Sequence, residues 1–154
     1  EWFLANVNRF EKEHIIDKWY DFLKIWLSIG KDVQKNRLEE RKWILKSWKS
    51  SEVDRQAQAK WKLYTKAKEQ VLLKTDTEIA PWIIIDSTQR YLSAVEIIKA
   101  ILSTQAEVRK IAESVLSIDL TPNQRIRRTW KQELEKMRQE GQIPVEKEFP
   151  FQKR

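Results

Sequence analysis

The sequence predicts an α/β fold that is mostly helical and contains two buried parallel strands. Two short apolar runs, at about 22–29 and 81–86, are rich in aromatic and β-branched residues, which is typical of strands buried on both faces. Longer segments with apolar residues at helical spacing surround these runs. The 154 residues include only two Gly and four Pro, which are fewer turn residues than an all-β protein needs.

The amino-terminal part of the chain predicts one helix before the first strand. Phe3, Val7 and Phe10 recur at helical spacing within residues 1–14, so we expect a short amphipathic helix there. The first strand follows at about 22–29, with the sequence Phe-Leu-Lys-Ile-Trp-Leu-Ser-Ile.

A basic, helix-rich excursion separates the two strands. We expect a helix at 31–45, a loop at 46–52 and a long helix at 53–74, before the second strand at about 81–86. Steps of three and four between apolar residues define the inward face of the long helix. The predicted members of this face are Val53, Ala57, Trp61, Tyr64, Ala67 and Val71.

Three helices are expected after the second strand. The first follows the strand directly, and the others lie at about 105–117 and 122–140. Pro122 near the start of the last helix and Gly141 just after it are typical of helix boundaries. Residues 142–154 are expected to form an irregular tail.

The order of these elements predicts an incomplete sheet. Strands that are separated by helical crossovers pair in parallel, and parallel sheets normally have more than two strands and helices on both faces. We therefore expect one side of a larger α/β sheet, whose other strands come from residues outside these 154 or from another chain. Glu rather than Met at position 1 also fits a fragment or a processed chain.

Composition narrows the classes of function. The net charge of +7 indicates a polyanionic partner, such as polyphosphate, nucleic acid or anionic lipid. Because the chain has no Cys and His14 has no second His beside it, neither a disulfide framework nor a metal site is predicted. No apolar run reaches the roughly 20 residues that span a membrane, and no leader pattern begins the sequence. We expect a cytoplasmic protein without a membrane partner.

Six motifs occur in a specific order along the chain. They lie at 8–11, 24–29, 34–41, 46–49, 61–64 and 75–82. The last motif, Thr-Asp-Thr-Glu-Ile-Ala-Pro-Trp, leads into the second strand. In this order and near this spacing the motifs resemble the C-terminal half of the polyphosphate kinase 2 family, over roughly residues 6–102. Members of that family move phosphoryl groups between inorganic polyphosphate and nucleotides, and Arg90 and Tyr91 favour the polyphosphate:AMP phosphotransferase branch.

The resemblance implies a fold and a division of the chain. The fold would be the C-terminal part of a P-loop kinase-like three-layer fold. Residues 1–103 would form the C-terminal half of a polyphosphate kinase 2-like domain, with a lid at about 42–60. A helical extension at 104–141 and an irregular tail at 142–154 would follow. The phosphate-binding loop and the metal-binding aspartate of the family lie upstream of the matching stretch and do not occur in this sequence.

Arg37 and Arg41 are the residues that the resemblance implies as catalytic. Their spacing of four residues places two guanidinium groups on one face of a helix. Phosphoryl transfer spreads anionic charge over peripheral oxygens in the transition state, and arginine supplies a permanently charged, planar fork for such charge. The alternative is a solvated helix face on which the arginines pair with Glu39 and Glu40.

Lys46, Trp48, Lys49 and Asp54 are implied as substrate-binding residues of the lid. A tryptophan between two cations suits a loop that closes over a nucleotide or a polyphosphate chain and excludes water. The family pattern here is Lys-Arg-Trp-Lys, and Ser47 replaces its arginine. The alternative for Trp48 is a structural anchor between the loop and the body of the protein.

The function implied by the resemblance is phosphoryl transfer between inorganic polyphosphate and a nucleoside mono- or diphosphate. Mg²⁺ would be the cofactor, with ligand residues outside this chain, and the full-length protein would be a homo-oligomer. The chain alone would be inactive, because nothing in it cradles the nucleotide phosphates. The alternative is a non-enzymatic, basic helical module that binds nucleic acid or a partner protein, with interleaved Trp and Tyr for base stacking. Against this alternative, Lys and Arg are distributed over all the predicted helices.

Overall fold

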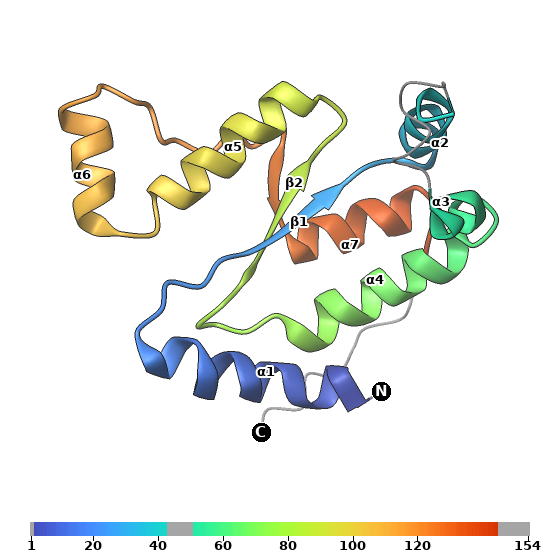
Figure 1. The fold of residues 1–154 in the computed structure, drawn as a ribbon, viewed down its shortest axis with the longest axis horizontal. Helices are drawn as coiled ribbons and strands as arrows, with labels where there is room; N and C mark the ends of the chain where they lie inside the picture. Colours follow the sequence, from blue (N-terminus) through green and yellow to red (C-terminus); the bar gives the residue numbers. More distant parts are fainter. Residues whose placement is uncertain (1, 43–50, 145–154) are drawn as a thin grey trace.

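The computed structural model describes residues 2–42 and 51–144, which form a three-stranded sheet with helices packed around it (Figure 1). The strands are β1 (Lys24–Ser28), β2 (Trp82–Asp86) and β3 (Arg127–Thr129), in the order β1-β2-β3. β1 and β2 are parallel, whereas β3 runs antiparallel to β2. The prediction of two parallel strands joined by a helical crossover is confirmed.

Helices make up most of the remaining described residues. Between β1 and β2 the chain forms three of them, and α5 follows β2 directly. The helices are α1 (Trp2–His14), α2 (Lys31–Glu40), α3 (Glu52–Ala57), α4 (Trp61–Thr75), α5 (Arg90–Leu102), α6 (Ala106–Ser114) and α7 (Trp130–Gln139), with a short 3-10 helix η1 (Ile16–Lys18) after α1. No helix among the described residues is long and apolar enough to cross a membrane.

The prediction of a single long helix at 53–74 is wrong, because the structure has two helices there, α3 and α4. A capping box starts α3, in which the Ser51 hydroxyl accepts from the Asp54 N–H and the Asp54 carboxylate accepts from the Ser51 N–H. The buried residues of α3 and α4 also differ from the inward face that was expected for one continuous helix. Val53 is 62% exposed, and the fully buried apolar residue of α4 is Leu72, which the predicted stripe did not include.

The prediction that the last helix begins at residue 122 is also wrong. Residues 127–129 pair with β2 as β3, and α7 begins only at Trp130. Thr129 caps this helix, because its hydroxyl accepts from the Gln132 N–H while the Gln132 side chain accepts from the Thr129 N–H. Ladder bonds with the exposed edge of β2 therefore override the helical pattern of the local sequence, and Pro122 lies in irregular chain before β3.

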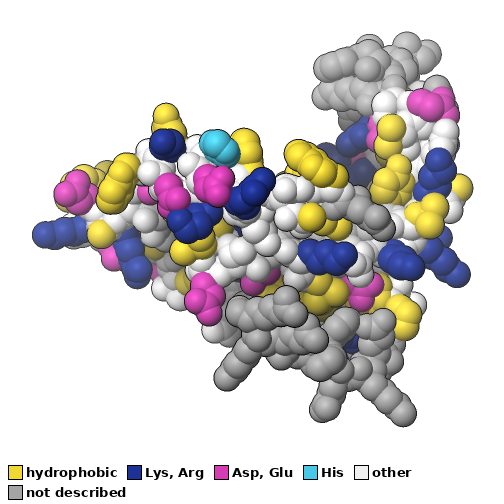
Figure 2. Space-filling view, turned by 90° about the horizontal axis from the view of Figure 1, so that it is seen from below, with side chains coloured by type: hydrophobic (Ala, Val, Ile, Leu, Met, Phe, Trp, Pro, Cys, Tyr) yellow, Lys and Arg dark blue, Asp and Glu magenta, His cyan; other side chains and the backbone are white. Residues whose placement is uncertain are grey.

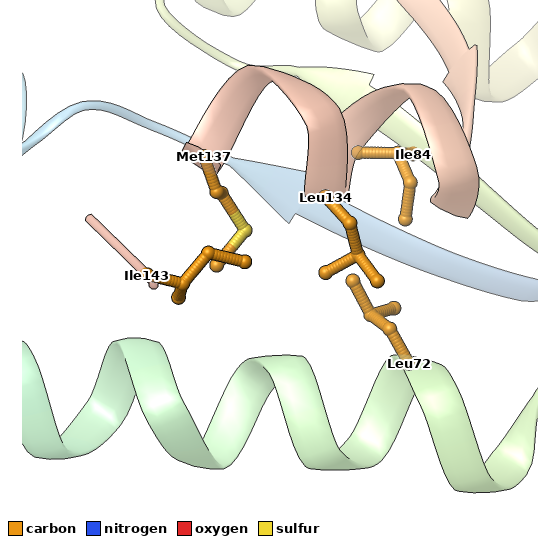
Figure 3. Packing of buried hydrophobic residues seen from close by; sticks show 5 residues of the cluster. All are labelled: Leu72, Ile84, Leu134, Met137 and Ile143. Atoms are coloured by element: carbon orange, nitrogen blue, oxygen red, sulfur yellow. The ribbon is translucent and has the colours of Figure 1, made fainter. Parts of the chain in front are cut away.

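The hydrophobic core joins α4, β2, α7 and the segment after α7. Figure 3 shows Leu134 and Met137 of α7 facing Leu72 of α4 and Ile84 of β2, with Ile143 beside them. The adjacent residue of β2, Ile85, is also fully buried but points to the opposite face of the sheet, which α5 covers. The result is three layers around β2.

The core position of Leu134 predicts a large effect of truncation. We expect Leu134→Ala to lower the free energy of unfolding by about 2–5 kcal/mol, because a cavity would form between α7, α4 and β2. Urea denaturation followed by the tryptophan signal would measure it. The matched control is Leu63→Ala on the exposed face of α4, for which a change within about 0.5 kcal/mol is expected. Equal effects of the two substitutions would contradict this core.

Candidate functional site

A cleft of about 280 Å³ opens at the carboxyl ends of β1 and β2. Ligands of open α/β sheets bind at this edge. The walls of the cleft come from β1, β2, α2, α4, α7 and the segments that follow β1 and α7. They carry polar side chains (Ser28, Lys68, Asp86, Glu133, Lys136) and aromatic ones (Trp26, Trp61, Tyr64).

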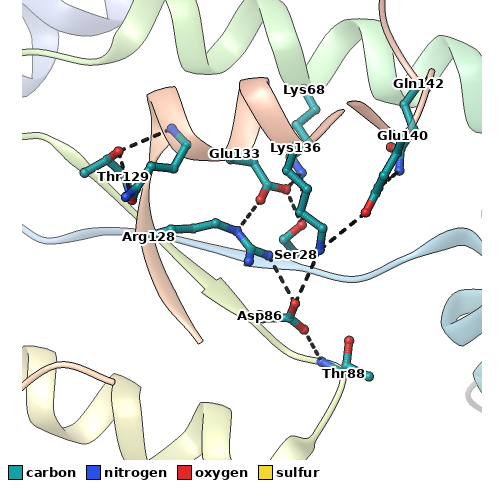
Figure 4. Close-up of polar contacts among 11 residues, drawn as sticks. Ser28, Lys68, Asp86, Thr88, Arg128, Thr129, Glu133, Lys136, Glu140 and Gln142 are labelled. Carbon is teal, nitrogen blue, oxygen red and sulfur yellow. Dashed lines mark hydrogen bonds and ion pairs between the residues drawn. The ribbon is translucent and has the colours of Figure 1, made fainter. Parts of the chain in front are cut away.

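Glu133 is the most buried charged group of the cleft. Its side chain is 2% exposed, yet its carboxylate meets three donors from three elements. Ser28 Oγ donates to Oε1 at 2.5 Å, Arg128 Nε donates to Oε2 at 2.5 Å, and the Lys68 ammonium forms an ion pair with Oε1. Figure 4 shows these contacts converging on Glu133 between the helices and the sheet. A buried carboxylate is tolerated only with such partners.

Asp86 extends the same network to the end of β2. Arg128 Nη2 donates to its carboxylate at 3.1 Å, so this guanidinium bridges Asp86 and Glu133. The Thr88 N–H donates to the other oxygen at 3.0 Å, and Lys136 Nζ lies 3.6 Å away. Through these contacts, the loop that follows β2 is attached both to β3 and to α7 (Figure 4).

Burial and charge shift the pKa values of this network in opposing directions. Burial raises the pKa of Asp86, but hydrogen bonds from Thr88 and Arg128 and the charge of Lys136 outweigh it, so the pKa falls from 3.8 to about 2. For Glu133, burial is likewise outweighed by Lys68, Ser28 and Arg128, and the pKa lies below its ordinary value. Burial lowers the pKa of Lys68 despite the attraction of Glu133. Both carboxylates are therefore ionised at neutral pH.

The network is nearly balanced in charge. Lys68, Arg128 and Lys136 each contact at least one carboxylate, and Glu140 lies 3.7 Å from Lys136. An anion that enters the cleft would meet cations already engaged by the protein's own acids. The network thus holds the ends of both strands, and Trp26, Trp61 and Tyr64 are the aromatic part of the wall.

The described residues do not fit the Mg²⁺ that the resemblance implies. Among residues 2–42 and 51–144, no group of three or more His, Asp or Glu side chains converges as metal ligands do. The two carboxylates of the cleft are held by Arg128, Lys68 and Lys136 instead.

Arg37 lies at the same edge of the sheet as the cleft. Its Nη2 donates to the carbonyl oxygens of Ser87, at 2.5 Å, and Thr88, at 3.1 Å, in the loop after β2. α2 begins three residues after β1 ends, which brings Arg37 across the carboxyl ends of both strands. The contacts with the loop, rather than with Glu39 or Glu40, hold its guanidinium in this structure.

Arg41 and Asp54 are brought together by the fold. Arg41 Nη1 lies 3.3 Å from Asp54 Oδ2, so the residue after α2 is tied to the first turn of α3. Arg37 and Arg41 therefore have different partners although they are one helical turn apart. Lys46, Trp48 and Lys49, the other predicted site residues, lie outside the described residues.

Sequence reasoning missed the residues of the cleft network. Asp86 ends the second predicted strand and Ser28 is the last residue but one of the first, so a polar side chain at the carboxyl end of a buried strand was an available signal. Lys68 and Glu133 lie among the charged residues of helices, where nothing local distinguishes a buried charge from a solvated one. Arg128 lies in the strand that the pattern placed in a helix.

Two side chains predicted on the buried face of the long helix lie on the cleft instead. Trp61 and Tyr64 both line it, and Tyr64 is 46% exposed. α4 begins at Trp61, after the turn at 58–60 that interrupts the predicted helix, so both residues lie in its first turn.

Comparison with known proteins identifies the class of this chain. The family model described as "Polyphosphate kinase 2 (PPK2)" matches residues 1–113, which include β1, β2 and the helices up to most of α6. A solved structure of polyphosphate kinase 2 from Arthrobacter aurescens TC1 superposes with a TM-score of 0.57 and 28% sequence identity. This superposition covers 79% of the present chain and 40% of that chain.

Two curated relatives show the same pattern of partial coverage. The ADP-polyphosphate phosphotransferase 1 of Rhizobium meliloti is 32% identical over 124 residues, which are 75% of this chain and 41% of the relative. A polyphosphate:AMP phosphotransferase of Acinetobacter johnsonii is 36% identical over 99 residues, which are 64% of this chain and 21% of the relative. The chain therefore spans less than half the length of these relatives.

Because three donors surround the Glu133 carboxylate, we predict that removing this carboxylate strongly lowers the stability of the fold. We expect Glu133→Ala to lower the free energy of unfolding by about 3–5 kcal/mol, because Lys68 and Arg128 would keep their buried charges without this carboxylate. Urea denaturation at neutral pH would measure it. Glu135→Ala, on the exposed side of the same helix, is the control and should change stability by less than about 0.5 kcal/mol. A stability of Glu133→Ala within that range would rule out the network as a stabilising element.

The lowered pKa of Asp86 predicts loss of stability in acid. Because its folded pKa of about 2 lies below its ordinary value of 3.8, ionised Asp86 stabilises the fold fully above about pH 4. This contribution is lost as the pH falls from about 4 to about 2, and Glu133 shifts in the same direction. Urea unfolding at several pH values in this window should give a smaller pH slope for Asp86→Asn than for the native chain. Identical slopes would show that Asp86 does not carry the dependence.

Proposed function

Because this chain belongs to the polyphosphate kinase 2 family, we propose that the protein that carries it transfers phosphoryl groups between inorganic polyphosphate and a nucleoside mono- or diphosphate. The observation that carries the proposal is the family match over residues 1–113. The superposition with a family structure over 79% of this chain supports it. The relatives named above are phosphotransferases that use polyphosphate, with different nucleotides in their names.

Arg37 and Arg41 are proposed to neutralise the phosphates during transfer. Arg37 already lies across the carboxyl ends of β1 and β2, where phosphate groups bind in open α/β sheets. It uses Nη2 for the loop carbonyls of Ser87 and Thr88, and no described residue accepts from its Nε or Nη1, so these donors are proposed to bind an anion. Arg41 lies one turn further along and is oriented by Asp54.

A lid at about 42–60 is proposed to close over the substrates, with Lys46, Trp48 and Lys49 as contacts. The structure supports an ordered base for it, because the Asp54 carboxylate both caps α3 and pairs with Arg41. Asp54 would then shape the lid rather than touch substrate. Ser47 stands where the family pattern has arginine, so this lid would offer one cation fewer.

Other parts of the proposal depend on the whole protein. A divalent cation, Mg²⁺, would neutralise phosphate charge, with ligands outside the described residues. A cytoplasmic location and a homo-oligomer are proposed together with the function. Arg90 and Tyr91 lead us to favour AMP as the nucleotide.

The nucleic-acid alternative has less support. The family match favours phosphoryl transfer, and on the face shown in Figure 2 the described Lys and Arg side chains are interspersed with acidic and hydrophobic ones and form no single basic stripe. Sequence-independent nucleic-acid binding is typical of one continuous basic groove.

The test is a phosphotransfer assay on the protein that contains this chain. With polyphosphate, Mg²⁺ and AMP or ADP, we expect polyphosphate-dependent phosphorylation of the nucleotide, and Arg37→Ala should lower kcat by about 100-fold or more, as loss of a charge-stabilising donor does. The 154-residue chain alone should be inactive. Nucleotide products separated by ion-exchange chromatography would measure both.

The control is Lys35→Ala, which removes a cation from an exposed position of the same helix. It should retain activity within about threefold, because surface charges far from the reacting phosphate act weakly through solvent. Absence of polyphosphate-dependent transfer by the intact protein would overturn the proposed function. Equal losses in Arg37→Ala and Lys35→Ala would overturn only the role of Arg37.

A further inference from the structure

The two carbonyl oxygens that hold Arg37 have different supports. Its Nη2 donates to the carbonyl oxygens of Ser87, at 2.5 Å, and of Thr88, at 3.1 Å. Ser87 is buried, and its N–H donates to the Ser28 carbonyl at 2.8 Å, which continues the backbone bonding between β1 and β2. Thr88 lies one residue beyond this bond, and its N–H donates to Asp86 Oδ1 at 3.0 Å. The position of the second carbonyl therefore depends on the Asp86 carboxylate.

Arg128 is the main group that orients the Asp86 carboxylate. Its Nη2 donates to Asp86 Oδ2 at 3.1 Å, and the two side chains are 14% and 22% exposed. Lys136 also approaches Oδ2, but at 3.6 Å and with a side chain that is 40% exposed. The attraction of such a half-exposed ammonium is screened by solvent and weakly directional. Arg128 thus holds Asp86 in the orientation that accepts from the Thr88 N–H.

The Arg128 guanidinium is itself fixed at its other end. Its Nε donates at 2.5 Å to Oε2 of Glu133, whose side chain is 2% exposed. Figure 4 shows the guanidinium between Glu133 of α7 and Asp86 of β2. A planar guanidinium, with donors in fixed directions, can hold two carboxylates at once, whereas a lysine ammonium acts as a single point charge. A continuous path of contacts therefore runs from α7 to the guanidinium of Arg37.

Arg128 lies outside the part of the chain that the family model matches. Arg37, Asp86 and Thr88 fall within residues 1–113, whereas Arg128 belongs to β3. A purely structural Arg128 would neutralise buried carboxylates and stabilise the fold, with no effect specific to Arg37. The contact path indicates more than this, because it ends at the residue that is proposed to neutralise the phosphates.

We propose that Arg128 is a positioning residue for phosphoryl transfer. By holding the Asp86 carboxylate, it keeps the Thr88 carbonyl in place and so directs the Arg37 guanidinium toward a phosphate at the carboxyl ends of β1 and β2. Arg128 does not touch the substrate itself. The inference rests on the proposed function, because the effect of Arg128 on the reaction passes through Arg37.

The test is Arg128→Lys in the protein that contains this chain. Lysine keeps the positive charge of the network but cannot bridge both carboxylates as the guanidinium does. With polyphosphate, Mg²⁺ and AMP, we expect kcat to fall by about tenfold or more, because small displacements of a catalytic group are costly. The KM values should change by less than about threefold, since the lost interaction belongs mainly to the transition state.

The matched control is Arg127→Lys, which makes the same change on the opposite face of β3. It should retain kcat within about twofold, because surface charges act weakly through solvent. A native kcat in Arg128→Lys would overturn the proposal, and so would an equal loss in Arg127→Lys.

A double-mutant cycle separates positioning from a structural role. In an Arg37→Ala background, Arg128→Lys should lower kcat by less than about twofold, because no guanidinium is left to position. A structural defect would instead lower kcat by the same factor in both backgrounds. Equal factors would therefore contradict the positioning role.

Hydrogen exchange tests the positioning without relying on activity. The Thr88 amide should exchange about tenfold faster in Arg128→Lys than in the native protein, because its acceptor Asp86 is no longer held in place. The amide of Ile84, in the middle of β2, should keep its native rate and so show that the variant is folded. An unchanged rate at Thr88 would overturn the role of Arg128. Faster exchange at Thr88 in a protein whose native form transfers no phosphoryl groups would overturn the proposed function and leave the control of this loop by Arg128 supported.

Discussion

The buried carboxylate of Glu133 is the constraint on which the rest of the structure depends. A charge that is 2% exposed requires partners, and these come from the end of β1, from α4 and from β3. Ser28, Lys68 and Arg128 must therefore converge, which sets the position of α7 across the sheet. Once α7 is placed, Leu134 and Met137 can bury their side chains against Leu72 and Ile84.

The fold could be predicted from the sequence where the signal was local and strong. The runs around Ile25 and Ile84 contain enough β-branched and aromatic residues to be recognised as buried strands, and their helical separation fixed parallel pairing. β3 could not be found in this way, because Arg127 to Thr129 are polar residues without alternation. Their strand conformation arises from the unpaired edge of β2, a tertiary cause that local propensity does not contain.

The residues of the candidate site likewise fall into those that the sequence could predict and those that it could not. Arg37, Arg41 and Asp54 could be named because they belong to motifs with a recognisable order, and the fold places Arg41 beside Asp54. Lys68 and Glu133 could not be named, since a buried ion pair leaves no trace in composition. Lys68 and Glu133 are 65 residues apart in the sequence. Only the packing of α4 against α7 brings their ammonium and carboxylate groups into contact.

The ion pair of Lys24 and Glu11 has a consequence for how α1 and the sheet depend on each other. The effect of removing a segment follows from the buried groups that the segment contacts. Here α1 provides the only carboxylate that meets the Lys24 ammonium in the described chain, and the centre of the Trp82 ring lies 5.4 Å from that ammonium. A chain cut after α1 would lose both this carboxylate and the cover that excludes water from Lys24, so the start of β1 would exchange a buried ion pair for a hydrated charge.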